Sequence, residues 1–299
     1  MKWLLVFVTG VTLLAQQPPR PKITGVAHIA LYAADYEKTR AFYRDFLGFE
    51  EPYSLNNADG SPSMTFFKIN ERQYIELSPE KQPGTDRLNH ISVETNDAEA
   101  MRAYLASRGL KVPAKVGKGR IGNSNFNIHD PEGHTVEIVQ YEPAGWTVRE
   151  QGKHLPANRV SKHMMHVGII VTDFDAEMKF YQEVLGFEEI WRGNAKDATH
   201  LSWVNLRVPD GEDYIEFMLF SEAPPPTKRG TAHHLCLEVP DINAARTALH
   251  TDAQPRVGIN RKRQLNLFDP DGTRTELMEP VTVDGKPAPK STLAPPAKP

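Results

Sequence analysis

An internal duplication constrains the fold of this chain more than any other feature of its sequence. The stretch from His28 to Glu51 returns from His166 to Glu189, with a constant offset of 138 residues (166 − 28). Each copy places a histidine in an apolar strand, then an amphipathic helix that carries Phe-Tyr and ends in Leu-Gly-Phe-Glu-Glu. Agreement over such a length indicates two copies of one structural unit.

The order of the predicted elements is repeated again inside each half. Alternating apolar residues predict a strand over residues 26–32, and Asp35 begins a helix that ends at Gly48, where a left-handed cap is favoured. Three strands follow, and the same order then starts again at Asn89. We therefore expect an α+β chain built from four strand-helix-three-strand (βαβββ) units.

These four units group into two modules, one in each half of the chain. The predicted parts are a signal peptide (1–17), module 1 (23–142), a linker (143–160), module 2 (161–280) and a disordered tail (281–299). The linker is rich in Pro and Gly, as connections between domains often are. In the tail, Pro, Lys, Ala and Ser dominate, and too few apolar residues remain to form a core.

The first residues have the pattern of a secretory signal. Lys2 precedes the apolar run Trp3–Ala15, and Gln and Pro follow it, which is typical of export with cleavage near Ala15. We expect a periplasmic or extracellular protein with no stable membrane insertion after cleavage. The net charge of −3 provides no basic field for nucleic acid. Cys236 is the only cysteine, so no internal disulfide can form.

Two histidines and two glutamates per half stand alone in strands whose other face is apolar. In chain order they are His28, Glu76, His90 and Glu137 in the first half and His166, Glu216, His234 and Glu276 in the second. Because side chains alternate along a strand, the apolar residues pack against the helices while the His and Glu residues face a concave cleft.

Two carboxylates and two imidazoles can be buried together only when they are paired or bound to a cation. Mixed nitrogen and oxygen ligands suit a divalent transition metal such as Zn, Mn, Fe, Co or Ni. Because both halves keep all four positions, the sequence predicts up to two ions per chain. The alternative is a polar cleft that binds a small molecule without metal.

The chain resembles the vicinal oxygen chelate superfamily, which includes glyoxalases, extradiol dioxygenases and antibiotic-resistance binding proteins. The resemblance covers about residues 23–280 and rests on the Phe-Tyr and Leu-Gly-Phe pairs and on the turns Asp130–Gly133 and Asp269–Gly272, each followed by a Glu. It implies two modules with cupped mixed sheets, and it makes the eight His and Glu positions metal ligands. Each site then lies within one half, or the ligands pair across the two halves.

Departures from the family patterns narrow the expected reaction. The position of the glutathione-binding Arg of glyoxalase I holds Tyr32 and Ile170, and that of a Tyr in extradiol dioxygenases holds Asn127 and Asn266. The sequence therefore predicts an exported, metal-dependent enzyme, lyase- or isomerase-like and not glutathione-specific, which chelates a small substrate through two oxygens. An extradiol-type dioxygenase and a non-catalytic binding protein are the alternatives.

Two further expectations follow from the resemblance. The catalytic residues that move the substrate proton are expected to be Glu76 and Glu216, one in each half. The expected partner is a small-molecule substrate, and the paired modules are expected to form a monomer.

Overall fold

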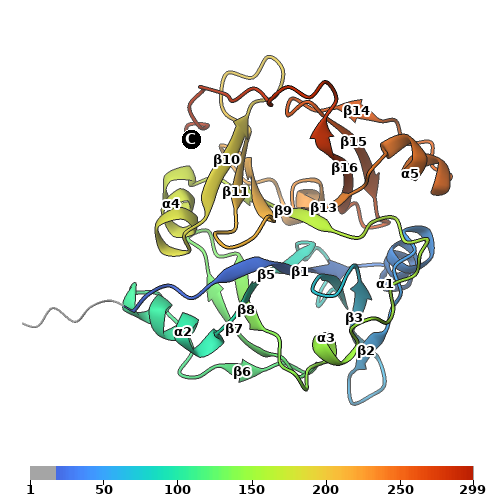
Figure 1. Cartoon of the computed structure of the whole chain (residues 1–299), viewed down its shortest axis with the longest axis vertical. Helices are drawn as coiled ribbons and strands as arrows, with labels where there is room; N and C mark the ends of the chain where they lie inside the picture. The colour runs from blue at the N-terminus through green and yellow to red at the C-terminus, as the bar shows by residue number, and fades with distance from the viewer. Residues whose placement is uncertain (1–17, 299) are drawn as a thin grey trace, which may run out of the picture.

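Two mixed sheets of eight strands each form the body of the molecule, one from each half of the chain (Figure 1). The computed structural model describes residues 18–298, so the predicted signal peptide lies outside the described residues. Each sheet is curled, helices such as α2 and α4 lie on the outside, and the two sheets lie one above the other in Figure 1. The predicted α+β fold with two cupped sheets is confirmed.

The strands follow the duplicated order. The first sheet contains β1 (Ile23–Ala33), β2 (Tyr53–Asn56), β3 (Pro62–Lys68), β4 (Tyr74–Pro79), β5 (Leu88–Thr95), β6 (Gly117–Lys118), β7 (Ser124–His129) and β8 (Thr135–Gln140). The second contains β9 (Met164–Val171), β10 (Glu188–Gly193), β11 (Trp203–Arg207), β12 (Tyr214–Leu219), β13 (His234–Glu238), β14 (Arg256–Val257), β15 (Lys262–Phe268) and β16 (Arg274–Thr282).

Short helices connect these strands. They are α1 (Tyr36–Ala41), the π-helical turn η1 (Phe42–Phe46), α2 (Ala98–Ser107), α3 (Trp146–Arg149), α4 (Phe174–Met178), the π-helical turn η2 (Lys179–Val184), the 3-10 helix η3 (Pro226–Thr231) and α5 (Ile242–Ala248). Asp35 caps α1 by accepting the backbone N–H of Lys38, and Asp97 caps α2 in the same way. Gly48, with φ +76°, ends the first helical segment as predicted.

Strand order brings four strands from different parts of each half together at the centre of each sheet. The orders are β2-β3-β4-β1-β5-β8-β7-β6 and β10-β11-β12-β9-β13-β16-β15-β14. The strands β4, β1, β5 and β8 are therefore adjacent, and so are β12, β9, β13 and β16. Each of these eight strands carries one of the predicted His or Glu residues, which places the four residues of each half on one stretch of sheet.

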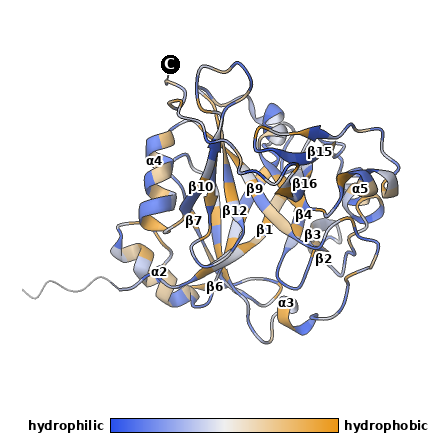
Figure 2. Cartoon of the chain, turned by 45° about the horizontal axis from the view of Figure 1, so that its top comes forward, coloured by the Kyte–Doolittle hydropathy of each residue, from blue (hydrophilic) through white to orange (hydrophobic). Residues whose placement is uncertain are grey.

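The apolar faces of both sheets belong to one continuous core. Ile29, Leu31 and Ile75 of the first sheet are fully buried with Val167 and Ile215 of the second. Figure 2 shows hydrophobic residues concentrated in central strands such as β1 and β12, whereas α2 and α4 carry hydrophilic residues as well. Burial of this shared face is the main stabilising contribution to the packing of the two halves.

Reciprocal turns join the halves. In the turn before β8, Glu132 accepts the backbone N–H groups of Thr172 and Asp173 at the start of α4, each at 2.5 Å. In the equivalent turn before β16, Asp271 accepts the backbone N–H of Ala34 at 2.8 Å, just before α1. Each half therefore supplies a carboxylate that accepts backbone N–H groups at or just before the start of a helix in the other half.

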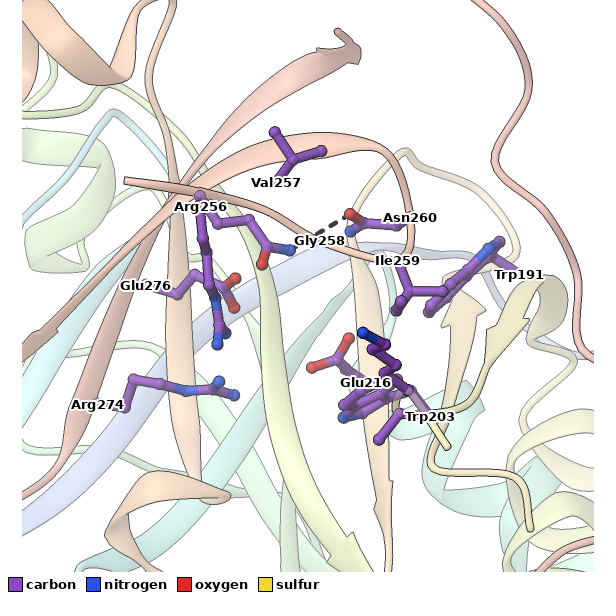
Figure 3. A pocket seen from close by; sticks show the side chains of 13 residues that line it. Trp191, Trp203, Glu216, Arg256, Val257, Gly258, Ile259, Asn260, Arg274 and Glu276 are labelled. Carbon is purple, nitrogen blue, oxygen red and sulfur yellow. Dashed lines mark hydrogen bonds between the residues drawn. The ribbon is translucent and has the colours of Figure 1, made fainter. Parts of the chain in front are cut away.

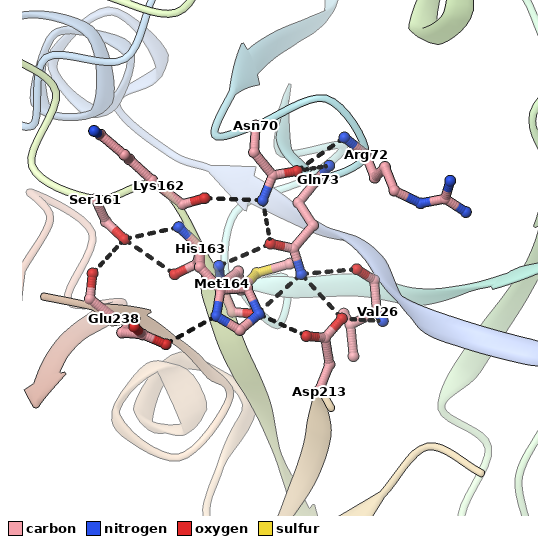
Figure 4. Close-up of polar contacts among 10 residues, drawn as sticks. All are labelled: Val26, Asn70, Arg72, Gln73, Ser161, Lys162, His163, Met164, Asp213 and Glu238. Carbon is pink, nitrogen blue, oxygen red and sulfur yellow. Dashed lines mark hydrogen bonds and ion pairs between the residues drawn. The ribbon is translucent and has the colours of Figure 1, made fainter. Parts of the chain in front are cut away.

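A buried polar network adds to this interface (Figure 4). The amide of Gln73 donates to the carbonyls of Val26 and Met164 at 3.1 and 2.9 Å, which lie in β1 and β9. Asp213 accepts the backbone N–H of Val26 at 2.8 Å and contacts Nε2 of His163 at 2.7 Å. The contact with Asp213 raises the pKa of His163 to about 9, so this imidazole is protonated at neutral pH.

The segment predicted as a linker takes part in the first half's packing. Trp146, in α3, is 2% exposed and contacts the rings of Phe66 and Tyr74, with centroids 5.8 and 5.7 Å away. A Pro- and Gly-rich composition predicts an exposed connection, but one aromatic side chain is enough to bind such a segment to a sheet.

The tail, for which the sequence predicts disorder from residue 281, contacts the second half of the chain in this structure. Strand β16 continues to Thr282, and the following residues lie along β10 through backbone hydrogen bonds. Trp191 Nε1 donates to the carbonyl of Pro289 at 2.9 Å, and the N–H of Leu201 donates to that of Ala294 at 2.7 Å. The tail lacks a core of its own, but the second sheet supplies hydrogen-bond partners.

Within residues 18–298, no helix is long and apolar enough to cross a membrane.

Candidate metal centres

The predicted His and Glu residues form two clusters, and each cluster lies within one half of the chain. Site 1 consists of His28, Glu76, His90 and Glu137, and site 2 consists of His166, Glu216, His234 and Glu276. Period-two alternation on four adjacent strands points the side chains of each set to the same hollow. Of the two arrangements that the sequence left open, the structure has pairing within one half.

In site 1 the donor atoms of His28, His90 and Glu137 lie within 4.8 Å of one another, and Glu76 lies beside the two histidines. The Nε2 atoms of His28 and His90 are 2.9 Å apart, and the carboxylates of Glu76 and Glu137 lie 3.5 and 3.7 Å from Nε2 of His28. Atoms that bind one transition-metal ion at about 2.1 Å and at right angles lie about 3 Å apart. The observed separations are close to that spacing.

The charges of site 1 fit a divalent cation. Burial, and next the charge of Glu137, raise the pKa of Glu76 well above its usual range, and burial raises that of Glu137 to about 7. Burial also lowers the pKa of His90 to about 4, which keeps this imidazole neutral and able to act as a ligand. Two facing carboxyl groups, which a bound cation would keep ionised, and neutral imidazoles are mixed oxygen and nitrogen donors that suit a divalent transition metal.

Aromatic residues form one wall of site 1. The ring of Tyr74 stacks on His28 with centroids 4.6 Å apart, and Trp146 packs on the other side of Tyr74. A cavity of about 120 Å³ lies over Glu76, His90 and Glu137, and Arg120 lies on its rim. A larger hollow of about 510 Å³ also reaches His90. Site 1 therefore has room for a small ligand.

Site 2 repeats this geometry. The Nε2 atoms of His166 and His234 are 3.1 Å apart, and Glu216 and Glu276 lie 3.4 and 3.6 Å from Nε2 of His234. Burial lowers the pKa of His166 to about 4. Tyr214 packs on His166 at 4.6 Å, as Tyr74 does on His28.

Site 2 differs from site 1 by an arginine. Arg274 is 8% exposed, and one of its terminal nitrogens lies 2.8 Å from Nε2 of His234. Figure 3 shows Arg274 and Glu276 on one side of the pocket and Glu216 with Trp203 on the other. The cavity has a volume of about 260 Å³.

The carboxylates of site 2 also titrate differently from those of site 1. Burial alone would raise the pKa of Glu276, but contact with His234 and the charge of Arg274 lower it to about 2. The pKa of Glu216 is lowered as well, again by contact with His234 against the effect of burial. Both glutamates of this site are therefore ionised at neutral pH.

A third group of donor atoms lies between the halves. Asp130 and His134 of the first half and Glu177 of α4 have ligand atoms within 4.8 Å of one another. Nδ1 of His134 is 2.7 Å from Asp130, and burial raises the pKa of Glu177 to about 9. The equivalent turn of the second half has Thr273 in place of His134.

All eight predicted residues lie in the two sites, but sequence reasoning missed two neighbours. Arg274 stands two residues before Glu276, so strand alternation alone would have placed it on the ligand face. Trp146 had no such signal, because its contact with the sheet depends on how the connecting segment folds. The basic residues 261–263 follow the loop that lines the pocket of site 2, and Arg261 and Arg263 pair with Asp284 and Glu279.

The fold agrees with a comparison with known proteins. Residues 25–138 and 163–277 match the Glyoxalase/Bleomycin resistance protein/Dioxygenase superfamily. Because these two segments cover most of the chain, the protein belongs to this superfamily.

Individual relatives come from more than one branch of the superfamily. A lactoylglutathione lyase of Schizosaccharomyces pombe is 23% identical over 268 residues, which cover 80% of this chain and 84% of that protein. The structure is similar to that of a Mn(II)-bound glyoxalase from Novosphingobium aromaticivorans, with TM-score 0.67, 17% identity and coverage of 92% and 89%. It is also similar to an extradiol ring-cleaving dioxygenase from B. fuscum, with TM-score 0.65, 18% identity and coverage of 91% and 76%. At such identities the structural likeness defines the fold and leaves the reaction open.

Proposed function

We propose that this protein is an exported enzyme that depends on a divalent metal and binds a small substrate through two neighbouring oxygens. The reaction is of the lyase or isomerase type, in which a proton moves next to a carbonyl group. The proposal rests on site 1, where two imidazoles and two carboxyl groups lie together beside a cavity. Among the described residues, no guanidinium forms a hydrogen bond with either histidine of this site.

Each residue of site 1 has a role in this proposal. His28, His90 and Glu137 hold the ion, and their donor atoms already lie within 4.8 Å of one another. A divalent ion in this position supplies Lewis acidity to the substrate oxygens. Glu76 lies beside both histidines and lines the cavity, so it is positioned to take a proton from the substrate carbon and return it. Glu216 is the equivalent residue of site 2.

Glutathione is not the expected substrate. Tyr32 and Ile170 replace the Arg of glyoxalase I, and the nearby Arg87 is paired with Glu80 at 2.8 Å. Without a guanidinium at the position of Tyr32 or Ile170, a charged carboxylate of the tripeptide loses a bidentate partner there, which costs roughly 2–5 kcal/mol. With the glutathione hemithioacetal of methylglyoxal, we expect kcat/KM well below about 10⁴ M⁻¹s⁻¹, the lower end of the usual enzyme range.

The proposal is tested by metal content together with proton exchange. The purified chain is stripped of metal, reloaded with Mn²⁺, Zn²⁺ or Ni²⁺ in turn, and analysed for bound metal. Each form is then incubated in D₂O with small α-hydroxy ketones and 2-oxo acids, and deuterium next to the carbonyl is measured by mass spectrometry. We expect metal-dependent exchange that Glu76→Gln slows by about 10²- to 10⁴-fold.

Glu222→Gln provides the matched control, since Glu222 is exposed and outside both sites. This variant should exchange at the wild-type rate. A chain that takes up no metal after reconstitution would exclude the enzyme proposed here. Bound metal without exchange on any probe, combined with tight binding of a small molecule, would instead favour the non-catalytic binding protein.

Two further parts of the proposal have separate tests. Export predicts that the mature protein recovered from outside the cytoplasm begins near residue 16, which N-terminal sequencing can check. The dioxygenase alternative predicts oxygen uptake with catechols in the Fe²⁺-loaded form. We expect none, because Asn127 stands where that branch carries its Tyr.

A further inference from the structure

The two sites differ at one matched position on the ligand face. Arg274 precedes Glu276 by two residues in β16 and pairs across the sheet with Phe268. Thr135 precedes Glu137 by two residues in β8 and pairs with His129, which is the same register. The duplicated sheet therefore presents a threonine beside site 1 and an arginine beside site 2.

The contact that Arg274 makes is with an atom that a metal would need. Nδ1 of His234 lies 2.8 Å from the carbonyl oxygen of Ala232, which can only accept, so Nδ1 carries the proton. A guanidinium can only donate, so Nε2 is the acceptor in the 2.8 Å contact with Arg274. Because the ring nitrogen has one lone pair, this hydrogen bond and a metal bond exclude each other.

The arginine cannot easily leave this position. Arg274 is 8% exposed, one of its terminal nitrogens lies 4.0 Å from the sulfur of Met218, and its Nε atom is buried without a hydrogen-bond partner among the described residues. A guanidinium remains charged at every accessible pH. Arg274 therefore cannot lose a proton and become neutral when a metal ion approaches. A divalent ion among Glu216, Glu276 and the histidines would therefore face a permanent like charge in the pocket.

We infer that Arg274 is the resident cation of site 2 and excludes a divalent metal from it, so that each chain carries one catalytic ion, held in site 1. This inference rests on the proposed function for site 1 and corrects the expectation of up to two ions. Site 2 retains a cavity of about 260 Å³ that Trp191 and Trp203 help to line, in which a guanidinium takes the place of a metal as the positive group.

Site-resolved metal counting tests the inference. The full chain and its variants are loaded with Mn²⁺, freed of loosely bound metal and counted by elemental analysis, with circular dichroism as a check on folding. We expect His90→Ala to lose one equivalent relative to wild type and His234→Ala to lose none. Arg274→Thr, which copies the residue of site 1, should gain one equivalent, and adding His234→Ala to it should remove that gain.

A reciprocal pair of variants provides the control. Thr135→Arg should abolish binding at site 1, and Arg274→Lys, which keeps the charge, should not gain the second equivalent. Loss of an equivalent in His234→Ala alone, or no gain in a folded Arg274→Thr, would overturn the inference and leave the proposed function intact. If His90→Ala loses nothing, the proposed function itself fails. All variants retain the cluster at Asp130, so the differences report the two sites alone.

Discussion

Replacing Trp146 with Ala should destabilise the protein strongly, although this residue belongs to the segment between the two modules. The side chain is 2% exposed and packs on Phe66, Tyr74 and Tyr53. A buried Trp removes about 200 Å² from water, which corresponds to roughly 5 kcal/mol at 25 cal/mol/Å². Measured Trp-to-Ala losses of about 3–5 kcal/mol agree with this figure. We therefore expect the midpoint of thermal unfolding to fall by roughly 10 °C.

Urea unfolding followed by far-ultraviolet circular dichroism measures this loss without relying on the fluorescence of the deleted residue. Trp203→Ala is a suitable comparison, because Trp203 is only partly buried and should cost less. Since Tyr74 stacks on His28, the Trp146 variant should also bind Mn²⁺ at site 1 more weakly. A loss of stability below about 1 kcal/mol would refute this reasoning and return the segment to the role of a simple connection.

Two other predictions concern the second half. The raised pKa of His163, about 9 against an ordinary 6.5, means that its contribution to stability is complete below pH 6.5 and is lost as the pH rises through 9. Stability in urea should therefore fall between pH 7 and pH 10 by about 1 kcal/mol more in wild type than in His163→Gln, a modest figure because the ring is partly exposed. Gly168→Ala would place a Cβ 2.0 Å from the ring of His234. The free energy of unfolding, measured in urea, should therefore fall by about 1–3 kcal/mol. An unchanged urea midpoint would show that the His234 ring moves freely.

Much of the fold and the grouping of the eight His and Glu residues could be predicted from the sequence because they depend on local periodicity. Alternation with period two assigned His28 and Glu76 to one face of their strands without knowledge of their neighbours. The duplication then supported each of these assignments, because the same residue type stands at the matching position of the other half. The same local signals misplaced boundaries: the strand expected over residues 26–32 runs from Ile23 to Ala33.

The remaining features depend on contacts between distant parts of the chain. Whether the ligands pair within one half or across the two depends on strand order, which periodicity does not encode. The tail follows β10 because Trp191 and neighbouring backbone groups bind it, and composition alone contains no information about that partner. The contact of the Trp146 ring with the first sheet likewise cannot be predicted from composition, because its partners lie far away in the sequence.

The reciprocal turns also bear on why the two sites can differ at all. If the two halves were separate copies of one polypeptide, every substitution would appear in both pockets at once, and an arginine at the position of Arg274 would enter both. Here Glu132 and Asp271 exchange equivalent contacts between non-identical halves of a single chain. Covalent fusion thus frees one pocket to change its chemistry while the other keeps its ligands, and the shared interface preserves the assembly.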